Sequence, residues 1–357
     1  MTMPSLSSSA SSPPDALSSL SGVCAVHGLD DLSGRLVELR TFLADDLHQV
    51  EGVLQSIAHG DAVAEQSARH LLNGGGKRLR PICVALASHL GAGFGAAARE
   101  YAVAVELIHN ATLLHDDVVD LGDRRRGVDT SRVVYGNAAS IFGGDWLLVE
   151  ALERVHRAGQ PEVVTRLLAL MKEMVLAESE QLACRGELRT QPDAYFRIID
   201  GKTAALFRWA MYAGARAGGL DAAAQARAEE YGTKLGMAFQ LVDDVLDVAG
   251  EAATTGKAVL TDLREGKMTY PLILAVQRDA ELCEVLTAIC RSDEVVIDVA
   301  LAARVAKTMQ DTGAAADCLE LAEAYCRGAV ECLAGLPPTW ARAALEGVAL
   351  ATPNRSR

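Results

Sequence analysis

Residues 99–117, REYAVAVELIHNATLLHDD, decide the fold class, because their apolar side chains recur every three or four positions. This spacing places the apolar side chains on one face of an α-helix. Residues 227–248, RAEEYGTKLGMAFQLVDDVLDV, repeat the pattern and also end in aspartates. The strict alternation of β-branched residues that marks a half-buried strand does not occur. We therefore predict an all-α protein, a single-domain multi-helix bundle.

The distribution of proline supports one helical domain between two irregular ends. Four prolines lie between residues 15 and 336, at positions 81, 161, 192 and 271, and each precedes an apolar-periodic run. Proline is favoured in the first turn of a helix, so these positions mark helix starts. Residues 1–28 are rich in Ser and Pro and are predicted to be a disordered tail. The helical domain is predicted to span 29–350, and 351–357 to be a frayed end.

Composition and charge exclude several classes of protein. Half of the 357 residues are apolar and the net charge is −13, which argues against a nucleic-acid partner. The eight cysteines form no CxxC pair, a pattern typical of reduced thiols. No apolar run approaches the roughly 18 residues of a membrane-spanning helix. A charged region followed by an apolar run is missing from the N-terminus, so we predict a cytoplasmic protein without a transmembrane segment.

Two acidic clusters stand at the ends of the apolar runs quoted above. Asp116 and Asp120 are four residues apart, so a helix places both carboxylates on one face; Asp243 and Asp247 repeat the spacing. Such clusters can be merely solvated helix faces. Leu and Val flank both clusters, however, so their aspartates are better placed to line a cavity. Carboxylates with open positions suit Mg²⁺, which is bound jointly with substrate phosphates.

Two basic clusters complete the pattern. GGGKRLRP at 74–81 is a glycine turn that carries cations into a helix start, a natural site for an anion. It is not a P-loop, because Arg78 follows the lysine and Leu71 replaces the first glycine. Arg124, Arg125 and Arg126 follow the first acidic cluster. These arginines can pair with the aspartates or grip a diphosphate bridged to them by Mg²⁺.

Taken together, these motifs resemble the trans-polyprenyl diphosphate synthase family, in particular its long-chain members of octaprenyl and heptaprenyl type. GGGKRLRP, ELIHNATLLHDDVVD, GKTAALF, FQLVDDVLD and DLREGKMTYPL occur in the family's order and approximate spacing over residues 40–335. The resemblance implies an all-helical bundle of the isoprenoid synthase type with a central substrate cavity. It also implies a Mg²⁺-dependent prenyltransferase that condenses isopentenyl diphosphate with an allylic diphosphate.

The resemblance assigns roles to individual residues. The residues implied to hold isopentenyl diphosphate are Lys77, Arg80, His109 and Arg126. Those implied to hold the allylic diphosphate are Arg125, Lys202, Thr203, Gln240 and Lys257. Direct metal ligands are Asp116, Asp120 and Asp243, with Asp247 in or close to the metal shell. Asp117 and Asp244 lie close by, and with Lys202 they complete the catalytic set.

The same resemblance implies about three Mg²⁺ ions per site, with Mn²⁺ as an alternative, and a homodimer. The chain departs from the family at two positions. Ala177 replaces a usual glycine before the Glu178–Gln181 pair, and Leu260 stands where glycine is common. Both changes put the local loop geometry in doubt but leave the chemical groups intact.

Residues upstream of the first cluster bear on product length. Ala111 and Thr112 lie one helical turn before Asp116, where short-chain members of the family commonly carry aromatic residues that block the product tunnel. Both residues are too small to block it, although they are equally suited to packing between helices. Ile108 and Ala104 continue the stripe. We therefore predict a product longer than C20.

Several alternatives remain open at this point. A geranylgeranyl or farnesyl diphosphate synthase belongs to the same family and would carry the same motifs. A non-catalytic subunit of a heteromeric synthase would be expected to lose aspartates, yet all six are present. A terpene cyclase needs an Asn/Ser/Glu metal motif, and none of the four asparagines lies near the second cluster. A head-to-head synthase of the squalene type has no use for an isopentenyl diphosphate pocket.

Overall fold

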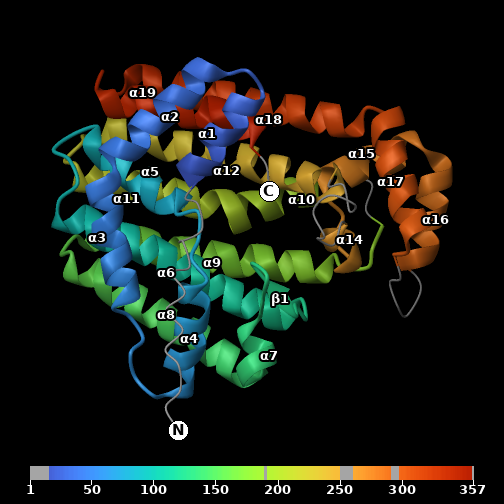
Figure 1. Ribbon diagram of the computed structural model, residues 1–357, viewed down its shortest axis with the longest axis horizontal. Helices are drawn as coiled ribbons and strands as arrows, with labels where there is room; N and C mark the ends of the chain where they lie inside the picture. The colour runs from blue at the N-terminus through green and yellow to red at the C-terminus, as the bar shows by residue number, and fades with distance from the viewer. Residues whose placement is uncertain (1–15, 189–190, 250–259, 291–296, 356–357) are drawn as a thin grey trace, which may run out of the picture.

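Figure 1 shows a computed structural model that describes residues 16–188, 191–249, 260–290 and 297–355. The described chain is a single helical bundle, and its only sheet is a two-stranded hairpin, so the predicted all-α class is confirmed. The first half consists of α1 (Ala16–Val26), α2 (Asp30–Phe42), α3 (Ala44–Gln55), α4 (Val63–Asn73), α5 (Leu79–His89), α6 (Ala96–Val119), β1 (Arg124–Arg125), β2 (Val128–Asp129), α7 (Ser131–Tyr135), α8 (Asn137–Arg157) and α9 (Pro161–Ala183). The second half consists of α10 (Asp193–Ile199), the π-helix η1 (Asp200–Ala204), α11 (Ala205–Ala217), α12 (Ala222–Ala249), α14 (Thr261–Arg264), α15 (Tyr270–Arg278), α16 (Ala280–Cys290), α17 (Val299–Asp311), α18 (Ala314–Cys332), the 3₁₀ turns η2 (Leu333–Gly335) and η3 (Thr352–Asn354), and α19 (Trp340–Ala351).

The centre of the bundle is formed by the two helices that end in aspartates. Helix α6 packs against α5, α8 and α11, and α12 packs against α11 and α18. Glycine allows α12 to approach α11 closely: a Cβ at Gly232 would lie 2.6 Å from the Phe207 carbonyl oxygen, and one at Gly236 2.5 Å from Ala204 Cα. Tyr101, Tyr231 and Phe207 are fully buried between these helices. This core holds the ends of α6 and α12 at the same side of the bundle.

A second, smaller core stabilises the far end of α18, where Figure 1 shows α15, α16 and α17 gathered together. Leu263, Leu272 and Leu286 are buried there. All four prolines expected at helix starts lie in or next to one: Pro81 is the third residue of α5, Pro161 the first of α9 and Pro271 the second of α15, and Pro192 immediately precedes α10. The loop between α14 and α15 is thereby anchored at the edge of the bundle.

The hairpin after α6 places the arginines that follow the first acidic cluster. Arg126 and Gly127 occupy its turn with φ of 51° and 82°. Positive φ at both central residues is the geometry of a type I′ turn, which matches the twist of a two-stranded ribbon. Strands β1 and β2 pair antiparallel, with Arg125 opposite Val128. The turn therefore sends Arg125 and Arg126 in fixed and different directions.

The boundaries predicted for the two chain ends are wrong. Residues 16–26, assigned to the disordered tail, form α1, and its side chains Leu17, Leu20 and Cys24 are buried at helical spacing against α2 and α19. At the other end, α19 continues into η3, where Thr352 is buried and Arg355 is 9% exposed. Apolar periodicity outweighs the Ser-rich composition of the first segment. Residues 1–15 and 356–357 lie outside the described ranges. Within the described ranges, no helix has the length and apolarity needed to cross a membrane.

Candidate active site

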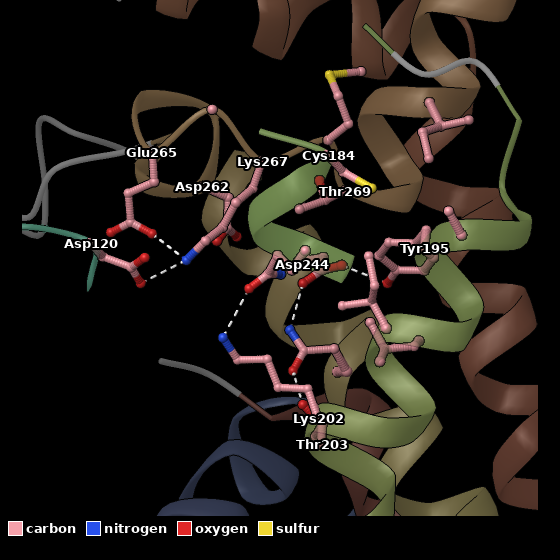
Figure 2. Close-up of a pocket in the computed structure, with 18 of the residues that line it drawn as sticks. Asp120, Cys184, Tyr195, Lys202, Thr203, Asp244, Asp262, Glu265, Lys267 and Thr269 are labelled. Atoms are coloured by element: carbon pink, nitrogen blue, oxygen red, sulfur yellow. Dashed lines mark hydrogen bonds and ion pairs between the residues drawn. The ribbon is translucent and has the colours of Figure 1, made fainter. Parts of the chain in front are cut away.

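A cavity of about 260 Å³ opens between the ends of α6 and α9, helix α10, η1, α12 and the loop before α15. Figure 2 shows labelled side chains from these segments turned toward it. Its charged lining residues are Asp116, Asp120, Arg125, Glu187, Lys202, Asp244, Asp262, Glu265 and Lys267. Its apolar lining residues are Leu113, Ala194, Ile198, Ile199, Met268 and Ile273. A cavity lined by both charged and apolar side chains suits a ligand with a charged head and an apolar body.

The first aspartate cluster divides between the cavity and the protein interior. Asp116 and Asp120 border the cavity, as their spacing on α6 predicts. Asp117 is buried and accepts a hydrogen bond from Arg125 Nε at 2.9 Å, while its second oxygen has no hydrogen-bond partner. Burial raises the pKa of Asp116, and the charge of Lys202 partly opposes this shift. Asp117 thus orients Arg125, and Asp116 and Asp120 face the ligand space.

Asp120 contacts two basic residues to which the sequence analysis gave no role. Arg185, just after α9, donates to one carboxylate oxygen of Asp120 and to the Val119 carbonyl. Lys267 Nζ lies 2.8 Å from the other oxygen and 2.6 Å from Glu265 (Figure 2). Lys267 belongs to the motif DLREGKMTYPL, so the sequence could have indicated it as a site residue. Nothing in the sequence distinguishes Arg185 in this way.

The second aspartate cluster is oriented differently. Asp244, its middle member, borders the cavity and is 2% exposed. Asp243 does not border it and instead pairs with Arg355 Nη2 at 2.6 Å. Asp247 accepts a hydrogen bond from the backbone N–H of Asp262 at 3.1 Å. The carbonyl of Phe239 also accepts from Arg355, whose guanidinium lies over the Phe239 ring. The chain end, predicted to be frayed, therefore contributes to the site.

Asp262 is a further acidic residue that the sequence analysis missed. It borders the cavity beside Asp244 (Figure 2), and burial, followed by the charge of Asp247, raises its pKa to about 7. Burial and the charge of Asp262 raise the pKa of Asp244 well above its ordinary value. A carboxyl group with this shift lacks compensating positive charge. This corner of the cavity thus favours a bound cation.

Lys202 projects from η1 into the acidic side of the cavity. Its Nζ lies 2.5 Å from Glu178, 2.9 Å from Gln181 and 3.7 Å from Asp116. The wider turn of a π-helix is often found at functional sites, because it re-aims side chains without breaking the helix. Next to Lys202, Thr203 Oγ1 donates to Gln240 Oε1 at 2.7 Å, and Gln240 Nε2 donates to Asp244 at 2.7 Å. The structure therefore brings Lys202, Thr203 and Gln240 together, as predicted for one ligand.

The two departures from the family pattern are accommodated in different ways. Ala177 packs against Gly201, where an added Cβ would lie 2.7 Å from the Ala177 methyl carbon. Leu260 adopts φ 58° and ψ 40°, a left-handed conformation that costs a non-glycine residue about 1–2 kcal/mol. Its side chain is buried in the second core, and its N–H donates to the Asp247 carbonyl. The backbone beside the second cluster thus adopts a left-handed turn at Leu260, and the strain of a non-glycine residue there is the local energetic cost.

The residues predicted for isopentenyl diphosphate gather around the start of α5. Arg78, at φ 54°, is buried and pairs with Glu106 at 2.6 Å and Glu51 at 3.0 Å. A Cβ on Gly76 would lie 2.9 Å from Arg78 Nη1 and 3.3 Å from Arg126 Nη2, so both guanidinium groups pass close to this glycine. Arg80 lies with its guanidinium 4.6 Å above the Phe207 ring. Glu106 thereby neutralises only part of the arginine charge.

His109 and Lys77 occupy different positions around this arginine cluster (Arg78, Arg80, Arg125 and Arg126). Burial, then the charges of Arg80 and Arg126, hold the pKa of His109 well below its usual range, so His109 is neutral. Lys77 is exposed, and its carbonyl accepts a hydrogen bond from the Ala16 N–H at 2.8 Å. Except for Arg125, none of these residues lines the 260 Å³ cavity. Lys257 lies outside the described residues.

The donor set fits a magnesium-type cation shared with a ligand. Within the described ranges, no three His, Cys, Asp or Glu side chains stand close enough to hold a metal ion by themselves. Mg²⁺ does not need such a cage, because it retains waters and binds through one or two carboxylates plus substrate phosphates. The raised pKa values of Asp116, Asp244 and Asp262 indicate negative charge that a cation would offset. All three offer the oxygen ligands that Mg²⁺ and Mn²⁺ prefer.

Comparison with known proteins agrees with this geometry. The sequence model of the polyprenyl synthetase family matches residues 61–305. Heptaprenyl diphosphate synthase component 2 of Geobacillus stearothermophilus is 34% identical over 317 residues, which cover 88% of this chain and 98% of that protein. Octaprenyl diphosphate synthase of Escherichia coli (strain K12) is 36% identical over 246 residues, which cover 68% of this chain and 75% of that protein.

Solved structures show the same likeness over nearly the whole chain. The decaprenyl diphosphate synthase of Rhodobacter capsulatus superimposes with a TM-score of 0.82 and 32% identity, covering 90% of this chain and 99% of that one. The polyprenyl synthase of Caulobacter crescentus CB15, complexed with calcium and isoprenyl diphosphate, gives a TM-score of 0.83 and 34% identity, covering 89% and 97%. On these grounds the chain belongs to the polyprenyl synthetase family and is a trans-prenyltransferase.

Proposed function

We propose that this enzyme condenses isopentenyl diphosphate with an allylic diphosphate, head to tail and in trans geometry, to give a polyprenyl diphosphate longer than C20. One observation carries the proposal: carboxylates of both aspartate clusters and the cations Lys202 and Lys267 share a cavity that apolar side chains also line. The charged groups suit the diphosphate and the apolar side chains the prenyl chain. The relatives named as heptaprenyl, octaprenyl and decaprenyl diphosphate synthases support the product length.

The allylic diphosphate is assigned to the 260 Å³ cavity. Asp116 and Asp120 on one side and the second cluster on the other would hold Mg²⁺, about three ions per site, with Mn²⁺ as an alternative. Bound there, the cations would neutralise the negative charge that develops on the leaving diphosphate. Lys202 and Arg125 supply fixed donors to its oxygens, and Lys257 is assigned the same role from the family resemblance.

Isopentenyl diphosphate is assigned to the start of α5, to the part of the arginine cluster that does not include Arg125. Lys77, Arg80 and Arg126 offer charge-assisted hydrogen bonds to its phosphates, and neutral His109 offers one more. In the reaction the allylic C–O bond breaks, and the double bond of isopentenyl diphosphate forms the new C–C bond. One proton is then lost from the condensed chain, and the departing diphosphate is a suitable acceptor for it. The chain's own part is to hold the two substrates in line and to exclude water.

Product length rests on the relatives more than on the α6 stripe. Ala104, Ile108 and Ala111 are at most 1% exposed, and they belong to the packed core instead of the cavity lining. The role of this stripe as a tunnel wall therefore stays a prediction. A geranylgeranyl or farnesyl diphosphate synthase is the alternative within the family. A short-chain isoprenyl diphosphate synthase of Methanothermobacter thermautotrophicus, which is 37% identical over 220 residues, supports this alternative.

The exposed apolar residues of α8 and α9 support a homodimer. They recur at seven-residue intervals on each helix, which places them on one face of it. These residues are Phe142 and Val149 on α8 and Leu168, Val175 and Leu182 on α9. An apolar face of this kind marks a protein–protein contact. Light scattering of the purified chain tests the homodimer, and a monomeric mass would contradict it.

The cytoplasmic location stays a prediction.

The function is tested with the purified chain alone, labelled isopentenyl diphosphate and an allylic primer in Mg²⁺. We expect incorporation of label into an acid-labile product longer than C20, sized by mass spectrometry or thin-layer chromatography. A main product of C20 or shorter would overturn the length assignment. Turnover that requires a second, different chain would favour the non-catalytic or heteromeric alternative, which the component 2 relative raises.

A further inference from the structure

Tyr195 contacts the second aspartate cluster but has no role in the reaction described above. It lies on α10 and is 7% exposed, and its hydroxyl donates to Asp244 Oδ2 at 2.5 Å (Figure 2). The other oxygen, Oδ1, accepts from Gln240 Nε2 at 2.7 Å. Both oxygens of the only member of the second cluster that borders the cavity are thus held by neutral donors.

The orientation of Gln240 is itself determined by the structure. Thr203 Oγ1 donates to its carbonyl oxygen at 2.7 Å, so the amide nitrogen must face Asp244. A continuous chain of three hydrogen bonds therefore runs from Thr203 through Gln240 and Asp244 to Tyr195. It joins η1, which carries Lys202, to α12 and α10. Each of these hydrogen bonds has a donor–acceptor distance of 2.7 Å or less. A displacement of one group therefore displaces its hydrogen-bond partner as well.

The ring of Tyr195 connects this chain to the loop that carries Lys267. It stacks on Tyr270, with 5.8 Å between ring centroids and 23° between planes, and Phe196 packs edge-on at 5.2 Å. Tyr270 is the first residue of α15 and follows Lys267 by three positions. One buried side chain thus contacts Asp244 through its hydroxyl and, through its ring, the start of the helix that follows Lys267.

We infer that Tyr195 is a positioning residue that anchors Asp244 and so sets the geometry of the second cluster for the cation and its diphosphate. A carboxylate that is held on both oxygens cannot rotate toward the cavity centre, and it presents one fixed charge to the metal shell. The inference deepens the proposed function, because it rests on the assignment of Mg²⁺ to this cluster. Fixed supporting contacts of this kind commonly tune metal affinity by about 10- to 100-fold.

The test is Tyr195→Phe, which removes one oxygen and keeps the ring. The Mg²⁺ concentration for half-maximal turnover should rise about tenfold, the scale of one lost hydrogen bond to a charged group. A readout independent of turnover is the rise in melting temperature caused by Mg²⁺ with inorganic diphosphate, which should shrink in the variant. The matched control is Tyr270→Phe, which alters the stacked neighbour and should leave both quantities within about twofold of wild type.

A second variant keeps the inference testable if Tyr195→Phe folds poorly. Asp244→Asn keeps the shape of the anchored side chain and should raise the Mg²⁺ requirement at least as much. If Tyr195 acts through Asp244, combining the two changes adds little to the effect of Asp244→Asn alone. Additive effects, or an unchanged Mg²⁺ requirement in Tyr195→Phe, would overturn the inference. A wild-type chain that Mg²⁺ and diphosphate fail to stabilise would instead defeat the metal assignment itself.

Discussion

The two aspartate clusters have the same spacing, at positions i, i+1 and i+4, yet they meet the cavity with different members. In the first, the outer pair Asp116 and Asp120 border it and Asp117 is turned inward to Arg125. In the second, the middle member Asp244 borders it, and Asp243 pairs with Arg355. Successive residues of a helix are about 100° apart, so a rotation of the helix by that order exchanges the member that faces the cavity. Spacing decides which carboxylates share a face, and packing decides where that face points.

The two clusters also differ in their partners. Four cations, Lys202, Arg185, Lys267 and Arg125, contact the first cluster. In the second, Asp244 is held by a hydroxyl and an amide, and its pKa is well above the ordinary value. The protein therefore compensates the first cluster's charge more fully than the second's. A bound cation should gain more electrostatic free energy at the second cluster than at the first.

The largest expected effect is loss of a carboxylate that the family resemblance assigns to the metal, although Asp243 pairs with Arg355 and does not border the cavity. Asp116→Ala or Asp243→Ala should lower turnover by roughly 10²-fold or more, the scale of losing one preorganised electrostatic element. The melting temperature should not fall in Asp116→Ala, since removing clustered like charge relieves repulsion, whereas Asp243→Ala leaves Arg355 without its ion pair and should lower it. Steady-state kinetics and calorimetry measure both quantities. The control is Asp311→Ala, an exposed carboxylate paired only with Lys307 on α17. Near-normal turnover in either variant, or full activity with a chelator, would defeat the metal assignment.

The region before the first cluster gives the next largest effect. Ala111→Phe should shorten the main product to C15–C20 while isopentenyl diphosphate is still consumed, because a ring at this buried position would enter the path predicted for the growing chain. The second cluster has Ala238 and Phe239 in the corresponding positions, so it already carries an aromatic residue one turn before its first aspartate. Product analysis by mass spectrometry measures the change. An unaltered product distribution would show that the stripe is packing between helices.

The basic residues on the two sides of the first cluster should separate the two substrates. Arg80→Ala should raise the KM for isopentenyl diphosphate by about tenfold and that for the allylic substrate far less, and Arg125→Ala should do the reverse. The reason is that Arg125 borders the cavity, whereas Arg80 lies over Phe207. Arg327→Ala, at an exposed ion pair on α18, is the control. Equal effects on both substrates from each variant would argue for a single pocket.

The weaker charge compensation of the second cluster predicts a pH dependence of stability in metal-free protein. The pKa of Asp262 is about 7 when folded and about 3.8 when unfolded, so the folded state binds the proton more tightly. The free energy of unfolding should therefore fall as pH rises from 4 to 7, by roughly 2 kcal/mol between pH 5 and 8. Asp262→Asn should remove that part of the slope. Urea unfolding in chelator measures it, and an identical slope in both proteins would contradict the prediction.

The smallest effect is expected at Arg355. Its ion pair competes with a cation for Asp243, so Arg355→Ala should lower the Mg²⁺ concentration for half-maximal turnover by about two- to threefold. The change is small because Asp243 is 43% exposed and solvent screens the pair. Titration of turnover with Mg²⁺ measures it. The direction is opposite to that expected for Tyr195→Phe, and a raised Mg²⁺ requirement would show that Arg355 supports Asp243 instead of competing for it.

Local patterns were enough to predict the main helices, because the apolar periodicity of 99–117 and 227–248 predicted α6 and α12. The family resemblance implied that Lys202, Thr203 and Gln240 hold one substrate. The structure places these three side chains close together and Lys202 near Asp116, and their role stays a prediction. The same reasoning failed for α1, because a composition rich in Ser and Pro concealed the spacing of Leu17, Leu20 and Cys24.

The sequence by itself determined which chemical groups this enzyme has and which of them share a helix face, because both properties depend on neighbours within one or two turns. Only the tertiary structure decided which aspartates border the cavity and what holds them there. Arg355, Tyr195 and Lys267 reach the aspartates from segments 112, 49 and 147 residues away in the chain. Such contacts depend on how whole helices pack, and no local pattern of residues records them.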